Sequence, residues 1–153
     1  MQILKTTFFT ATIVLLCVIA NAQNEAALQK AFSESYTLEY NKKYTEAIAT
    51  IVKVNSDGNY ETNLRLGWLY YNNKNYTQSQ THYQKAASLK PYSVEAKLGL
   101  VKPLSALESW DKVLEQYEEI LKIDAQNYTA NYWAGVIHYN RKKYDAAIKL
   151  FEK

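Results

Sequence analysis

Cysteine, proline, glycine and histidine are all scarce in this chain of 153 residues, which contains 1 Cys, 2 Pro, 4 Gly and 2 His. A single cysteine excludes a disulfide framework, and so little glycine and proline excludes collagen-like and low-complexity disordered chains. Basic residues exceed acidic ones only by 18 to 15 and form no run, so nucleic acid is not an expected partner. This composition favours long helices joined by short turns.

Groups that carry catalysis or hold metals are equally rare. Neither His82 nor His138 has a His or Glu three or four residues away, the spacing at which two helical ligands would share a metal ion. We expect His138 to pack between two helices and His82 to face solvent. Because Gly-rich phosphate loops, nucleophile elbows and HExxH motifs are also missing from the sequence, we expect no enzymatic activity, no cofactor and no metal site.

The first 22 residues have the composition of a secretory signal peptide. Lys5 is their only charge, residues 8–19 form an apolar run, and Ala20-Asn21-Ala22 supplies small residues before a cut at Gln23. Retention as a membrane anchor is the alternative, but the apolar run is well short of the about 20 residues that span a bilayer. Because the end of this segment and the Asn-rich turns also resemble those of exported bacterial proteins, we expect a periplasmic or secreted protein without a membrane span.

The rest of the chain repeats itself at a fixed offset of about 34 residues. Residues 66–71 align with residues 134–139 two periods later, and Tyr76 and Tyr83 fall on Tyr144 and Phe151 at the same separation. Within each unit, apolar residues recur at spacings of three and four in two stretches that a polar turn separates. The pattern predicts a pair of amphipathic helices in each unit.

This pattern resembles the tetratricopeptide repeat family. The residues that carry the resemblance in the unit 60–93 are Leu66-Gly67, Tyr70, Ser79, Tyr83 and Pro91. After a lead-in over residues 23–27, the units are 28–59, which is two residues short, then 60–93, 94–127 and an incomplete 128–153. The resemblance implies an all-α, right-handed superhelical solenoid of antiparallel helix hairpins, with about three and a half to four repeats.

The sequence predicts two different roles for the glycines within helices. Gly67 and Gly135 lie where the two helices of a hairpin must approach closely. Gly99 instead precedes Pro103 by four residues, and a proline inside a helix clashes with the carbonyl four residues back. We therefore expect Gly99 to give the backbone slack for a bend at residues 101–103.

In this family the first helices of the repeats line a concave face that binds segments of other proteins, and we expect the same here. Aromatic and amide side chains suit such a surface. The alternative is that several of these rings only pack against the next repeat. Lys102 is the only cation in the predicted groove, so a clamp for a C-terminal carboxylate is not expected. The predicted groove residues are Tyr36, Tyr40, Leu64, Trp68, Tyr71, Asn72, Leu98, Lys102, Ser105, Tyr132, Val136, Tyr139 and Asn140.

These observations predict a non-catalytic protein–protein interaction module or scaffold of the cell envelope, which holds a partner segment in its groove. The alternative is a structural or regulatory N-terminal part of a larger assembly or enzyme, with the activity beyond residue 153. The last unit stops at Lys153 while its apolar stripe is still running, and solenoid ends normally carry a polar cap. We expect that the chain is truncated there, or that further repeats or self-association cover this end.

Overall fold

The computed structural model describes residues 23–55 and 58–153, so the predicted signal peptide at residues 1–22 lies outside the described residues. The chain divides into two compact units, one ending at Val54 and the other running from Asn55 to Lys153. Throughout the described residues, every regular element is a helix. The predicted all-α fold of helix hairpins is therefore confirmed.

In the first unit, a helix over residues 23–40 is followed by α2 (Tyr44–Val52), and a three-residue turn joins them. The interior is small: Ala31, Ser35, Ala47 and Ile51 are at most 5% exposed. The Ser35 hydroxyl is satisfied locally because Oγ donates to the carbonyl of Phe32 at 2.9 Å. This unit is thus a single helix hairpin.

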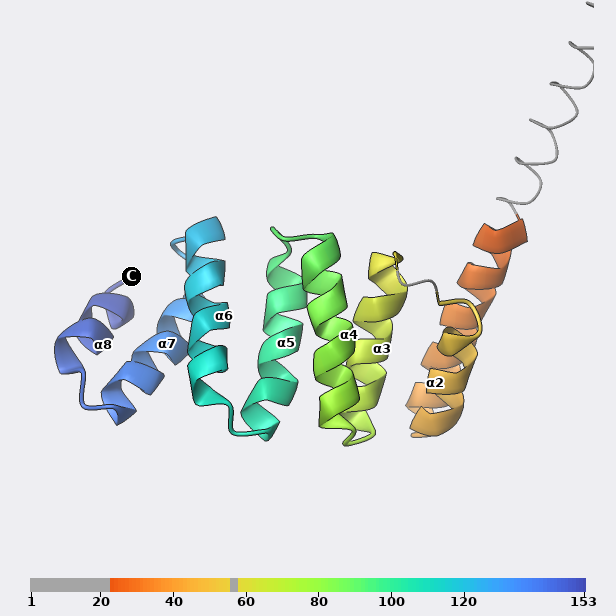
Figure 1. Cartoon of the computed structure of the whole chain (residues 1–153), viewed down its shortest axis with the longest axis horizontal. Helices are drawn as coiled ribbons and strands as arrows, with labels where there is room; N and C mark the ends of the chain where they lie inside the picture. Colours follow the sequence, from red (N-terminus) through yellow and green to blue (C-terminus); the bar gives the residue numbers. More distant parts are fainter. Residues whose placement is uncertain (1–22, 56–57) are drawn as a thin grey trace, which may run out of the picture. The chain divides into compact units, whose positions relative to one another are not determined.

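The second unit contains six helices, which follow one another as a row of hairpins (Figure 1). The first helices of its three hairpins are α3 (Tyr60–Asn72), α5 (Val94–Ala106) and α7 (Tyr128–Asn140). The second helices are α4 (Tyr76–Leu89), α6 (Trp110–Ile123) and α8 (Tyr144–Phe151). The equivalent helices of successive hairpins begin one repeat length apart, which is the offset seen in the sequence.

Side-chain caps fix where the first helices begin. Asn59, Ser93 and Asn127 precede α3, α5 and α7, and each side-chain oxygen accepts a hydrogen bond from the backbone N–H three residues later. The three distances are 2.8, 3.1 and 3.1 Å. Such a cap satisfies one of the four backbone donors that have no partner inside the helix, and it contributes about 1 kcal/mol to stability.

The turns inside the hairpins are also built alike. After α3, Lys74 adopts a left-handed conformation with φ of 62°, and the N–H of Asn75 donates to the carbonyl of Tyr70 at 2.9 Å. This is the Schellman arrangement, which ends a helix by satisfying its last carbonyls. The equivalent left-handed residues of the other hairpins are Lys42, Glu108 and Lys142.

The ring of Tyr83 is enclosed between two glycines on different hairpins. A Cβ atom built on Gly67 would lie 2.7 Å from the ring, and one built on Gly99 would lie 2.2 Å from it. Gly67 therefore has its expected role, whereas Gly99 lets α5 approach Tyr83 in addition to preceding Pro103. The helix α5 continues through the buried Pro103 to Ala106, and the expected bend there stays a prediction.

The two histidines occupy different environments from one another. The ring of His82 stacks on Tyr70 with centroids 5.3 Å apart, and its Nδ1 lies 2.9 Å from Oδ1 of Asn63. Because the amide oxygen can only accept, Nδ1 of His82 donates this bond. The expectation of a solvated His82 is therefore wrong, because the Asn63 amide and the Tyr70 ring hold it in place. His138 is half-buried with its Nδ1 inside, in line with a packed histidine.

Candidate interaction groove

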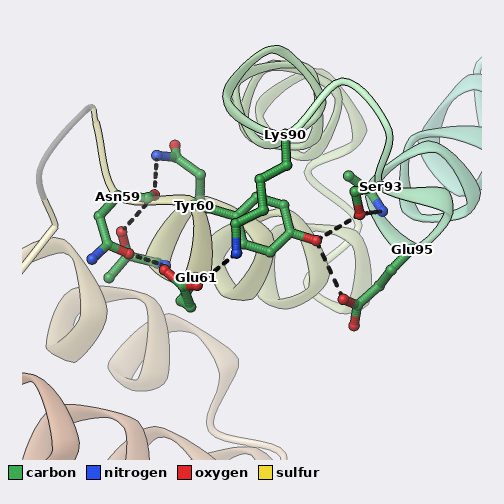
Figure 2. Close-up of polar contacts among 9 residues, drawn as sticks. Asn59, Tyr60, Glu61, Lys90, Ser93 and Glu95 are labelled. Atoms are coloured by element: carbon green, nitrogen blue, oxygen red, sulfur yellow. Dashed lines mark hydrogen bonds and ion pairs between the residues drawn. The ribbon is translucent and has the colours of Figure 1, made fainter.

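The junction between the α3–α4 hairpin and α5, which we call the closed junction, is held by polar contacts as well as by the Tyr83 ring. Figure 2 shows the hydroxyl of Tyr60 between Ser93 and Glu95, at 2.8 Å from Ser93 Oγ and 3.3 Å from a Glu95 carboxylate oxygen. On the ring face, the Lys90 ammonium lies 3.8 Å from the Tyr60 centroid and 3.0 Å from Glu61. Burial raises the pKa of Tyr60, and the hydrogen bond from Lys90 lowers the pKa of Glu61.

The next junction, between the α5–α6 hairpin and α7, lacks the residues that close the first one, and we call it the open junction. Val94 stands one repeat after Tyr60, so no hydroxyl is available to bind the next helix cap. One repeat later, Val101 replaces Gly67, Trp133 replaces Gly99, and Tyr117 is the counterpart of Tyr83. The tryptophan side chain on α7 takes up space that a glycine leaves free, so α7 cannot approach α6 as closely as α5 approaches α4. In Figure 1 α7 is visibly tilted against α6.

A groove of about 1230 Å³ opens at this junction, between α5 and α7, with α6 contributing its first two turns. Val101, Val113, Tyr117 and Ile137 form its buried apolar floor, being at most 8% exposed. The half-exposed rings of Trp110 and Trp133, 49% and 48% exposed, stand at its edges. The groove therefore combines a buried apolar floor with a rim of amphipathic aromatic rings.

Six residues of the predicted groove line this cavity: Tyr71, Leu98, Lys102, Ser105, Val136 and Asn140. The other predicted members in the second unit do not line it. Leu64 and Trp68 are half-buried against the core, and the Asn72 amide donates to the Trp68 carbonyl at 2.9 Å. Tyr132 contacts Trp133 and Phe151, while Tyr139 contacts Tyr144. Tyr36 and Tyr40 belong to the first unit, where they are 56% and 89% exposed.

Sequence reasoning missed the contribution of α6 and part of the α7 region. The assignment of the groove to first helices alone left out Trp110, Val113 and Tyr117, which come from the second helix of their hairpin. It also left out Trp133 and Arg141. One signal was present in the sequence: Trp133 occupies the position that Gly99 holds one repeat earlier, and such a change in size alters helix packing.

The charges around the groove balance. An ion pair with 2.7 Å between Arg141 Nη2 and Asp111 Oδ1 joins the turn after α7 to the start of α6. Lys102 and Glu108 add one charge of each sign. Lys102 is exposed, and its ammonium lies 5.6 Å from the Trp68 ring centroid, within cation–π range. Burial raises the pKa of Tyr117 to about 12, so this phenol at the base of the groove is neutral at physiological pH.

Among residues 23–55 and 58–153 the structure shows no group of three His, Cys, Asp or Glu side chains that could hold a metal ion. In the same part of the chain, none of the helices combines the length and the apolar character that a membrane crossing requires.

Two family models, each described as a tetratricopeptide repeat, match residues 60–93 and 94–153. Together they take in well over half of the chain, and a row of helix hairpins at this constant offset is the architecture that such repeats define. The chain therefore belongs to the tetratricopeptide repeat family, whose members are protein-interaction modules. No curated protein sequence matches this chain.

Solved structures show the same fold at low sequence identity. The crystal structure of MamA is 20% identical with a TM-score of 0.73, over 82% of this chain and 74% of that one. A tetratricopeptide repeat protein from Parabacteroides merdae is 16% identical with a TM-score of 0.77, over 82% of this chain and 51% of that one. YrrB, described as having an unusual peptide-binding site, is 18% identical with a TM-score of 0.65, over 78% and 63% of the two chains.

Proposed function

We propose that this protein is a non-catalytic binding module that holds a segment of a partner protein in the groove between α5 and α7. The observation that carries the proposal is the groove itself, an apolar cavity of about 1230 Å³ edged by Trp110 and Trp133. Large aromatic rings dominate the energetics of protein interfaces because they bury much area and lose little conformational entropy.

The balance of charge around the groove says what kind of segment it suits. Because Arg141 is already neutralised by Asp111, a strongly charged segment would find little net attraction. A largely apolar segment gains instead from displacing water over the floor, at about 25 cal/mol for each Å² of apolar surface removed from solvent. YrrB is described as a peptide-binding protein, and the shared fold is compatible with that use of the groove.

Removal of one rim tryptophan tests this proposal. The protein and its Trp133→Ala variant are each crosslinked to a cell-envelope extract, and the proteins captured by the wild type are identified and quantified. Truncation of a tryptophan that a bound partner covers costs about 2 kcal/mol or more where the ring is a hot spot, so we expect Trp133→Ala to lower capture at least about 30-fold. Tyr92→Ala is the matched control, because Tyr92 is 84% exposed and does not line the groove. Equal capture by wild type and Trp133→Ala would refute the groove as the site.

We also propose that residues 1–22 direct export and are removed, which leaves Gln23 as the new N-terminus. The support is the sequence of that segment, with one charge, an apolar run and small residues at the cut. Fractionation of expressing cells with N-terminal sequencing of the recovered protein tests it. A chain that keeps Met1 and stays in the cytoplasmic fraction would contradict the proposal.

A further inference from the structure

The dimensions of the groove limit the shape of the segment that can occupy it. Its walls are α5 and α7, each 13 residues long, which at 1.5 Å per residue gives walls of about 20 Å. One turn of an α-helix about 11 Å in diameter and 5.4 Å long fills roughly 500 Å³, so the cavity of about 1230 Å³ holds two to three turns.

A helix of two to three turns is roughly 13 Å long, which fits between these walls. The same seven to eleven residues in an extended conformation would span about 23 to 36 Å at 3.3 Å per residue, which is about 3 to 16 Å longer than the walls. A helical segment of this volume therefore fits entirely within the groove, whereas an extended segment of equal volume would extend beyond the ends of the walls.

The two long edges of the groove differ in charge. On the α5 edge, Lys102 is exposed, and its ammonium is held over the Trp68 ring by a cation–π contact. On the α7 edge, the charge of Arg141 is offset by Asp111 at 2.7 Å. Glu108, in the turn after α5, also lines the groove, so the positive charge that the α5 edge offers to an incoming segment is that of Lys102 alone. The buried floor between the edges offers an apolar strip. Such complementarity determines the orientation of a bound segment.

Resting on the proposed function, we propose that the occupant is an amphipathic α-helix of two to three turns from a partner protein. Its apolar residues, spaced three and four apart, lie on the floor formed by Val101, Tyr117 and Ile137. An acidic residue on one flank of that stripe pairs with Lys102. This is helix-in-groove recognition, in which one face of the helix supplies the anchors.

A displayed library of random 14-residue peptides tests the inference with the full chain as bait. We expect enriched peptides to carry apolar residues at spacings of three and four, with Asp or Glu on one flank. A proline placed in the middle of an enriched peptide, outside the apolar stripe, should weaken binding at least tenfold because it breaks the helix. Lys102→Glu should weaken binding about three- to tenfold, and an acidic-to-lysine change in the peptide should restore it.

The possible outcomes separate the inference from the proposed function. Enrichment of alternating or proline-rich peptides, or tolerance of the inserted proline, would overturn the helical occupant while leaving the groove as the site. Enriched peptides that bind Trp133→Ala and wild type equally would overturn the groove itself, and so would a library without enrichment. Tyr92→Ala, outside the groove, should bind every selected peptide as the wild type does.

Discussion

Replacement of Gly99 by alanine should destabilise this protein, although replacement of glycine by alanine in the interior of an ordinary helix stabilises that helix. Alanine is favoured over glycine by about 1 kcal/mol in a helix interior. At Gly99, however, the new Cβ would lie 2.2 Å from Cε1 of Tyr83, about 1.2 Å short of the 3.4 Å at which ordinary contact begins. The helix must move away from the ring, or the ring must move away from the helix.

The Tyr83 ring has little freedom to move, which sets the size of the effect. It is 3% exposed, and Gly67 also brings the α3 backbone close to it, with 2.7 Å from a built Cβ to the ring. Overpacking of a close-packed core costs typically about 1–3 kcal/mol, from which the propensity gain of about 1 kcal/mol is subtracted. We expect Gly99→Ala to lower the free energy of unfolding by up to about 2 kcal/mol.

Urea unfolding followed by circular dichroism measures this change, and hydrogen exchange at α4 and α5 shows whether the loss is local, as in stacked repeats. Gly58→Ala is the control, because nothing lies within 4 Å of a Cβ at Gly58 and stability should not fall. In a Tyr83→Leu background, which makes room, Gly99→Ala should become neutral or stabilising. A rise in stability with Gly99→Ala in the wild-type background would refute the reasoning.

Three further predictions concern single side chains. Tyr60→Phe removes the hydroxyl bonded to Ser93 and should lower the free energy of unfolding by about 1 kcal/mol in urea titrations; no change would show that the closed junction does not depend on this contact. Because burial raises the pKa of Tyr117 from 10.0 to about 12, the unfolded chain loses this proton first, so stability should be unaffected below pH 10 and fall between pH 10 and 12. Tyr117→Phe should flatten that part of the pH profile, and an unaltered profile would contradict the assignment. Lys74→Gly should raise the free energy of unfolding by up to about 1 kcal/mol, and with it the melting temperature, because φ of 62° is strained for lysine. A lower melting temperature would count against strain at this turn.

The repeat and its helices could be read from the sequence because they depend on local patterns. Apolar spacing placed two helices in each unit, and the capping residues Asn59, Ser93 and Asn127 recur at the offset of the repeat. Such signals act within a few residues of one another, so each unit carries them by itself. The turns also recur from unit to unit: Lys74 and Lys142 both adopt the left-handed conformation, although glycine adopts it with less strain.

The groove depended on contacts between hairpins, which the pattern within one unit does not contain. Because Trp68 and Val136 occupy equivalent positions on α3 and α7, a rule carried from one repeat to the next treats them alike. Only Val136 lines the cavity, whereas Trp68 packs against the core. The difference arises at the two junctions: Gly99 admits the Tyr83 ring, and Trp133 occupies the corresponding place one repeat later.

The sequence alone therefore determined the class of protein, the length of its repeat and the positions of its helices, since periodicity and caps act locally. Only the tertiary structure decided which junction closes and which one opens into a groove. Close packing leaves no room for a side chain where the backbone of α5 meets the Tyr83 ring, so the size of a single residue determines how near the next helix can come. The effect of that residue's size on helix packing can be deduced only when its neighbours on the other hairpin are known.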